Sequence, residues 1–168
     1  MLTPTLVRQE VEFITRIRKM KEKNISPITP KGKMKAKNKQ FKILLIDNDS
    51  SEATRLKGVF QKAKNMIVEW FHFARLSEAL KWLKSNKADV ILVGLWLPDG
   101  FGKDNILALQ AFAPDAPLLV LSDKEDEMLA ADLVEDGAES FMIRGFTNPR
   151  EAARMIYLAI KQQKLIWF

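Results

Sequence analysis

The sequence predicts an α/β fold in which a doubly wound parallel sheet of five strands carries helices on both faces. Five short apolar runs alternate with five segments of helical periodicity between Phe41 and Lys164. The clearest run, Asp89 to Leu95, is β-branched at three positions and stops at Pro98-Asp99-Gly100. Such an uninterrupted run is typical of a strand that is buried on both faces, as in a parallel sheet covered by helices. Parallel neighbours then require crossover helices, which are right-handed in nearly all proteins.

The apolar runs place the strands at Phe41–Ile46, Met66–Ala74, Asp89–Leu95, Pro117–Leu121 and Ser140–Ile143. Apolar residues three and four positions apart predict the helices at 50–64, 77–86, 103–112, 125–136 and 149–163. Side chains that commonly cap helices stand at three of the starts, and these are Asp49 or Ser50, Ser77 and Asn148. Gly137 is expected to end the fourth helix.

The chain is expected to have four parts: an amphipathic helix in residues 1–23, a linker in 24–40, the α/β domain in 41–164 and an apolar tail in 165–168. In the first part, apolar residues from Leu6 to Met20 form a stripe opposite charged residues. The linker contains Pro27, Pro30 and Gly32, and its alternating lysines repel one another and extend the chain.

The charge is unevenly distributed along the chain. Residues 1–40 hold 11 Lys/Arg and 3 Asp/Glu, whereas the remainder holds 16 Lys/Arg and 18 Asp/Glu, so the net charge of +6 comes from the extension. We therefore do not expect the α/β domain to bind nucleic acid. The chain has no cysteine, no secretory signal and no apolar run of the roughly 20 residues that span a bilayer, so we expect a cytoplasmic protein.

Polar side chains follow several of the predicted strands. In an open α/β sheet, ligands bind in the crevice beyond the carboxyl ends of the strands. The residues at these ends are Asp47, Asn48, Asp49, Gly94, Ser122 and Arg144. His72, the one histidine, lies within an aromatic strand, so a core or sheet-surface role is expected.

Several enzyme classes lack their motifs in this sequence. No G-x-G-x-x-G or Walker loop follows the first strand, so dinucleotides and nucleoside triphosphates have no phosphate cradle. No nucleophile elbow is present either. We expect no catalysis and no cofactor.

Four motifs occur in order: FKILLIDND, the apolar run with LWLPDGFG, VLSD and GAESFMIRGF. Together they resemble the response-regulator receiver family of two-component signalling and phosphorelays, over about residues 41–161. The resemblance implies the flavodoxin-like strand order 2-1-3-4-5. It also implies that Gly94 occupies the phosphoacceptor position, Asp47 and Asn48 the acidic pair, Ser122 and Arg144 the positions of the conserved hydroxyl and lysine, and Phe141 the switch position.

The departures from this pattern concern the chemistry of phosphorylation. Gly94 has no side chain to accept a phosphoryl group, and Asn48 removes a carboxylate from the expected Mg²⁺ site. Only Asp47 and Asp49 are left as metal ligands, so we expect no specific metal site. The chain therefore resembles a pseudo-receiver, which acts through protein–protein interaction without phosphorylation. The crevice residues then have structural roles: Asp47, Asp49 and Ser122 as helix caps, or Arg144 in an ion pair with Asp47.

Two alternatives stay open at this point. A relocated carboxylate, Asp99 or Asp123, would make the domain an atypical phosphorylated receiver, and a ligand in the crevice would make it a small-molecule sensor. The partner is expected to be a protein of a signalling or regulatory assembly. A homodimer is expected through the fourth helix, fifth strand and fifth helix, since the fourth helix is acidic and the fifth basic, or through the N-terminal helix.

Overall fold

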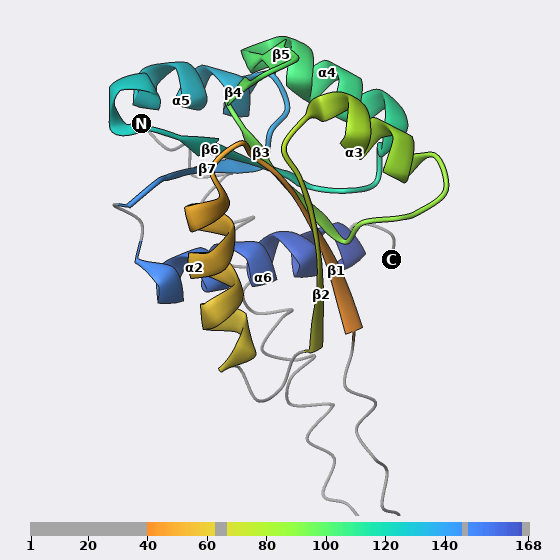
Figure 1. Ribbon diagram of the computed structural model, residues 1–168, viewed down its shortest axis with the longest axis vertical. Helices are drawn as coiled ribbons and strands as arrows, with labels where there is room; N and C mark the ends of the chain where they lie inside the picture. The colour runs from red at the N-terminus through yellow and green to blue at the C-terminus, as the bar shows by residue number, and fades with distance from the viewer. Residues whose placement is uncertain (1–39, 63–66, 146–147, 166–168) are drawn as a thin grey trace, which may run out of the picture. The chain divides into compact units, whose positions relative to one another are not determined.

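The computed structural model describes residues 40–62, 67–145 and 148–165, all of which belong to one of the chain's two units, residues 38–168. Its centre is a five-stranded parallel sheet in the order β2-β1-β3-β6-β7 (Figure 1). These strands are β1 (Gln40–Ile46), β2 (Ile67–Phe73), β3 (Val90–Gly94), β6 (Leu118–Ser122) and β7 (Ser140–Ile143). Counted along the sheet's own strands, this is the predicted order 2-1-3-4-5, so the fold prediction is confirmed.

Five α-helices connect and follow the strands: α2 (Ser50–Gln61), α3 (Leu76–Leu83), α4 (Gly102–Phe112), α5 (Glu127–Glu135) and α6 (Pro149–Leu165). A short 3₁₀ turn, η1 (Lys124–Asp126), precedes α5 where a continuous helix was predicted. Figure 1 shows α2 and α6 on one face of the sheet and α3, α4 and α5 on the other. Leu165, assigned to an apolar tail from the sequence, is the last residue of α6.

The central strands are buried on both faces, which explains their uninterrupted apolar sequence. Along β1, Ile43 and Leu45 pack in the cluster shared with α2 and α6, whereas Leu44 and Ile46 pack in the cluster shared with α3, α4 and α5. All four side chains are fully shielded from solvent. Alternate residues of a strand point to opposite faces, so a single apolar run supplies both layers of the core.

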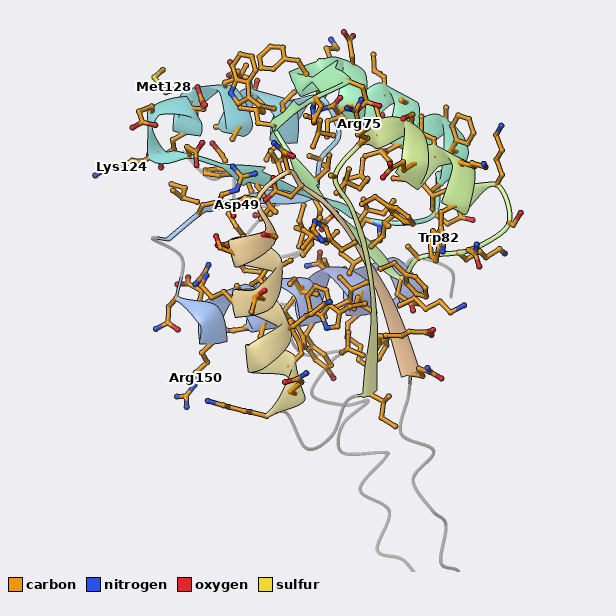
Figure 2. The ribbon with its side chains drawn as sticks, in the orientation of Figure 1. Asp49, Arg75, Trp82, Lys124, Met128 and Arg150 are labelled. Atoms are coloured by element: carbon orange, nitrogen blue, oxygen red, sulfur yellow. The ribbon has the colours of Figure 1, made fainter. Side chains whose placement is uncertain are left out.

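The edge strand β2 is covered by aromatic contacts instead. Trp70 meets Phe60 of α2 edge to face at 5.5 Å between ring centroids, on one side of the strand. On the other side Phe71 meets Trp82 of α3 at 4.5 Å, and Figure 2 shows Trp82 between α3 and the sheet. Aromatic pairs of this kind add stability beyond the area they bury.

The segment after β3 forms a hairpin that the sequence did not predict. The sequence indicated only that the strand stops at Pro98-Asp99-Gly100, but Trp96–Leu97 (β4) pairs antiparallel with Gly100–Phe101 (β5). The prediction that Ser77 caps α3 is also wrong. The helix begins one residue earlier, and the carboxylate of Asp99 in the hairpin accepts hydrogen bonds from the backbone N–H groups of Leu76 (2.8 Å) and Ser77 (2.9 Å).

The other two expected caps are present. Asp49 Oδ1 accepts the Ser51 backbone N–H at 2.9 Å at the start of α2, and Asn148 Oδ1 accepts the Arg150 N–H at 2.9 Å at the start of α6. The expected N-terminal helix, the linker up to residue 39 and the tail from residue 166 lie outside the described residues. Within the described ranges, no helix has the length and apolarity needed to cross a membrane.

Candidate functional site at the strand ends

Four adjacent strands end together and bring the predicted crevice residues to one edge of the sheet. Gly94 ends β3 and pairs with Leu121 of β6, while Ser122 ends β6 and pairs with Ile143 of β7. Asp47 directly follows β1, and Arg144 directly follows β7. The parallel register therefore delivers these residues from four separate segments to a single location, as the strand-end reasoning predicted.

Asp47 and Arg144 form a buried, two-pronged ion pair. Arg144 Nη2 lies 2.5 Å from Asp47 Oδ1, and Arg144 Nε lies 3.1 Å from Asp47 Oδ2. Only 2% of the Asp47 side chain and 14% of the Arg144 side chain are exposed. The planar guanidinium matches a carboxylate in this geometry, which the compact ammonium of a lysine cannot do. The sequence-based suggestion that these two residues pair is thus confirmed by the geometry.

Burial and the ion pair with Arg144 shift the pKa of Asp47 in opposite directions. Burial raises the pKa of Asp47 above its ordinary value, and the adjacent Arg144 guanidinium only partly offsets that rise. Burial also disfavours the charged form of Arg144, but the Asp47 carboxylate outweighs it and the pKa of Arg144 is raised. Arg144 is therefore permanently charged, and the ionised form of Asp47 depends on it.

The ion pair occupies the space directly in front of Gly94. A Cβ atom built on Gly94 would lie 2.9 Å from Asp47 Oδ1 and 3.0 Å from Arg144 Nη2. Atoms of real side chains do not approach that closely, so any residue larger than glycine requires the pair to move. The absence of a side chain at position 94 and the presence of the pair are two aspects of one arrangement.

The neighbouring acidic residues do not converge on a cation. Asn48 is exposed, and the Asp49 carboxylate is committed to capping α2 through Ser51, whose hydrogen bonds lower the pKa of Asp49. Figure 2 shows Asp49 at the start of α2, beside the strand ends. Within the part of the chain that the structure describes, no group of three or more His, Asp or Glu side chains is placed to hold a metal ion. A Mg²⁺ site built on Asp47 and Asp49 does not fit this arrangement.

Ser122 and the two candidate relocated acids have structural contacts. Ser122 is fully buried, and its hydroxyl donates to the backbone carbonyl of Asp123 at 2.8 Å, so the suggestion that it caps the following helix is wrong. Asp99 caps α3, and its hydrogen bonds with Ser77 and Leu76 outweigh desolvation, so that the pKa of Asp99 is lowered. Asp123 is half exposed and accepts a 3.4 Å hydrogen bond from Arg144 Nη1. Phe141, at the predicted switch position, is half-buried in β7 against the core shared with α3, α4 and α5.

Two residues near the site were not identified from the sequence. His72 Nε2 lies 2.8 Å from the backbone carbonyl oxygen of Asp47, so the imidazole donates there and joins β2 to the site. Asn105 of α4 is 1% exposed and directs its Nδ2 at the carbonyl oxygens of Gly94 and Leu95, 3.4 Å from each. A histidine in an aromatic strand and an asparagine in an amphipathic helix carry no sequence signal for such contacts, since both depend on tertiary structure.

Comparison with known proteins identifies the family. Residues 43–156 match the response regulator receiver domain family, and the chain belongs to that family. It is similar to the chemotaxis protein CheY of Thermotoga maritima, with 23% identity over 109 residues that cover 65% of this chain and 89% of the relative. It is also similar to the swarming motility regulation protein RssB of Serratia marcescens, with 26% identity over 80 residues. That match covers 48% of this chain and only 36% of the Serratia protein.

Solved structures show the same fold. A response regulator receiver domain protein from Clostridium thermocellum superposes with a TM-score of 0.65 at 21% identity, over 75% of this chain and 98% of that chain. The receiver domain of the sensor histidine kinase PA1611 from Pseudomonas aeruginosa, whose structure holds a magnesium ion in its active-site cleft, superposes with a TM-score of 0.62 at 16% identity. It covers 73% of this chain and 99% of that chain. This chain is therefore a signalling module of the receiver family.

Proposed function

We propose that this chain is a pseudo-receiver, a signalling module that acts through protein–protein interaction without being phosphorylated. The observation that carries the proposal is the Asp47–Arg144 pair in front of Gly94. A receiver that is phosphorylated needs a carboxylate nucleophile at this strand end and a cation to balance the phosphoryl oxygens. Here a guanidinium already neutralises the remaining carboxylate, and the nucleophile is missing.

The arrangement also makes phosphorylation-driven switching unnecessary. The pair joins the end of β1 to the end of β7, and Arg144 reaches Asp123 beyond β6 as well. In a phosphorylated receiver, charge arriving at the site would reorganise such contacts. In this chain the Arg144 guanidinium is already paired with the Asp47 carboxylate. The domain therefore keeps one conformation, and its binding surfaces do not depend on phosphorylation.

The test is exposure of the full-length protein to acetyl phosphate, or to beryllofluoride, with Mg²⁺, followed by intact mass measurement or ¹⁹F NMR. We expect no adduct. The single variant Gly94→Asp is also expected to give none, because its side chain meets the ion pair. The triple variant with Asn48→Asp, Gly94→Asp and Arg144→Lys supplies the family's residues and is the positive control that should accept the group.

A stoichiometric adduct on the unmodified chain would contradict the proposal. In that case Asp123 is the acid to examine, because it is exposed and lies beside Arg144. Loss of the adduct in Asp123→Asn, with its retention in Asp99→Asn, would establish the chain as an atypical receiver that uses a relocated carboxylate.

We further propose that the protein forms a homodimer through α5, β7 and α6. Helix α5 and its flanks are acidic, whereas α6 carries Arg150 and Arg154, both exposed, so a two-fold contact sets opposite charges against each other. Exposed apolar side chains at Tyr157 and Leu158 add to the α6 face. Light scattering on the full chain should give the mass of a dimer, and a monomer mass at high protein concentration would refute this proposal.

A further inference from the structure

An exposed aromatic pair stands on the hairpin after β3, apart from the α6 face. Trp96 and Phe101 are opposite each other in the β4–β5 ladder, with ring centroids 3.8 Å apart and 31° between the ring planes. Their exposed fractions are 56% and 41%. Met128, in the first turn of α5, is 84% exposed, and Figure 2 shows it projecting from the outer end of that helix. Large apolar side chains that contact each other at a surface mark binding sites more often than isolated ones do, and Trp96 and Phe101 are such a pair.

The tryptophan is held in place before any partner arrives. Its indole Nε1–H donates to Asp126 Oδ2 at 2.9 Å, which links the hairpin to the 3₁₀ turn before α5. Stacking on Phe101 restrains the same ring from its face. A side chain that is already fixed loses little conformational entropy on binding, which favours affinity. Tryptophan is also the residue most often found at the energetic centre of interfaces.

The surroundings of the pair are strongly acidic. Residues 123–139 contain eight carboxylates and one lysine, Lys124. Two of the carboxylates have basic partners from elsewhere in the fold, Asp136 with Lys103 at 3.6 Å and Asp123 with Arg144 at 3.4 Å. If Lys103, Lys124 and Arg144 each balance one carboxylate, five negative charges remain in excess. Glu125 and Glu127, both exposed, flank the aspartate that holds Trp96.

We infer that Trp96, Phe101 and Met128, with Glu125, Asp126 and Glu127, form a docking surface for a basic segment of a partner protein that combines arginine or lysine with aliphatic side chains. A cation over the indole ring gains from the ring's negative face, and the adjacent carboxylates add to that attraction. Nucleic acid and anionic lipid carry the same sign of charge as the surface, so it repels them. The inference rests on the proposed function, because a module that acts by protein contact needs a surface that selects its partner.

The test follows the Trp96 indole N–H by ¹⁵N NMR on the full-length protein. The chain has four tryptophans, so four indole signals are expected, and the variant Trp96→Phe assigns the relevant one. The probe is a short synthetic peptide of leucine and arginine in equal number. We expect its addition to shift the Trp96 signal to saturation, to leave those of Trp70 and Trp82 in place, and to have less effect at high salt.

Four variants and two control peptides make the outcome specific, and their affinities are measured by calorimetry because Trp96→Ala has no Trp96 signal. Trp96→Ala and the pair Glu125→Lys/Glu127→Lys should each weaken binding by about tenfold or more, whereas Glu78→Lys on α3 should leave it unchanged. The variant Asp126→Asn keeps an acceptor for the indole and removes one charge, so it should weaken binding less than Trp96→Ala. Peptides with glutamate for arginine, or serine for leucine, should bind at least about tenfold more weakly.

Equal weakening by Glu78→Lys, or no shift of the Trp96 signal, would overturn the inference. Two other occupants would do so as well. A shift that depends on protein concentration without peptide, and that persists when Arg150 and Arg154 are changed to glutamate to break the proposed α6 contact, would assign the surface to a second copy. A shift on changing the five lysines of residues 31–39 to glutamate, again without peptide, would assign it to this chain's own N-terminal segment. Because no phosphoryl donor is present, failure here leaves the adduct test of the proposed function untouched.

Discussion

Replacing Arg144 with methionine tests the energetic role of the buried ion pair. Methionine keeps most of the side chain's length and apolar volume but removes the charge and the hydrogen bonds to Asp47. The Asp47 carboxylate, with 2% of its side chain exposed, is then left buried without its cation. Removing one partner of a buried pair costs far more than the pair itself contributes, because the remaining charge has lost its solvation.

We expect Arg144→Met to lower the free energy of unfolding by about 3 kcal/mol at pH 8, at the lower end of the range for broken buried pairs. The lower end applies because Arg144 is partly exposed and because Asp47 can take up a proton instead of staying charged. The double variant Asp47→Asn/Arg144→Met has no buried charge, so it should recover about 1 kcal/mol or more of that loss.

The loss in free energy of unfolding caused by Arg144→Met should depend on pH, and the pKa of Asp47 sets the direction of that dependence. The pKa of Asp47 is raised even with Arg144 present, and it rises further without it. The folded variant then binds a proton more tightly than the unfolded chain, so its stability falls as pH rises from the ordinary value of 3.8 through the raised pKa. The difference between Arg144→Met and the unmodified protein should therefore shrink toward acid pH.

Urea unfolding monitored by tryptophan fluorescence at a series of pH values measures these differences. Lys103→Met is the matched control, because its 3.6 Å pair with Asp136 is exposed on both sides and should contribute about 0.5 kcal/mol or less. A cost below about 1 kcal/mol for Arg144→Met at pH 8, or a difference that does not change with pH, would refute the reasoning.

Asp99→Ala should cost about 1 kcal/mol at neutral pH through loss of the α3 cap, whereas Ser77→Ala, which removes only the side-chain hydrogen bond to Asp99 and keeps both backbone bonds, should cost less. Because the pKa of Asp99 is lowered, urea unfolding should show this difference above pH 3.8 and lose it as pH falls through the lowered value; persistence in strong acid would contradict it. Gly100→Ala should cost about 1–3 kcal/mol, since its Cβ would overlap Asn105 Oδ1. A Cβ atom at Gly58 in α2 would meet no other atom, so Gly58→Ala should raise the free energy of unfolding by about 0.5–1 kcal/mol. Equal shifts in melting temperature for Gly100→Ala and Gly58→Ala would refute this reasoning.

The parts of the fold that sequence reasoning predicted are those whose causes are local. Each central strand is buried on both faces, so an uninterrupted apolar run predicts it directly. The predicted carboxyl ends of β1 and β3 lie within one residue of the observed ends. The strand order required the resemblance to a family, because alternation of strands and helices is compatible with more than one order. Caps formed within a segment, at Asp49 and Asn148, were also predicted correctly.

Two of the missed contacts, those of Asp99 and Asn105, join segments that are distant in sequence, whereas the hairpin and the Ser122 hydrogen bond are local but leave no sequence pattern. Ser77 was a reasonable cap for α3, but the Asp99 carboxylate from the hairpin satisfies the same N–H groups. The hairpin itself is a two-residue ladder stabilised by one aromatic pair, too short to leave a strand pattern. Asn105 looked like an ordinary polar residue of a helix, and only the fold brings it beneath Gly94 and Leu95.

Gly94 and Arg144, at the ends of β3 and β7, are better explained together than separately. A glycine at position 94 leaves room that a two-pronged guanidinium can fill, and a lysine in place of Arg144 would offer only a single ammonium to Asp47. An aspartate at position 94 would in turn crowd that guanidinium and place a second carboxylate beside Asp47, where like charges repel. Restoring one family residue alone therefore sets it against the other. This mutual dependence is why we expect three simultaneous changes, and not Gly94→Asp by itself, to return a phosphoryl-accepting site.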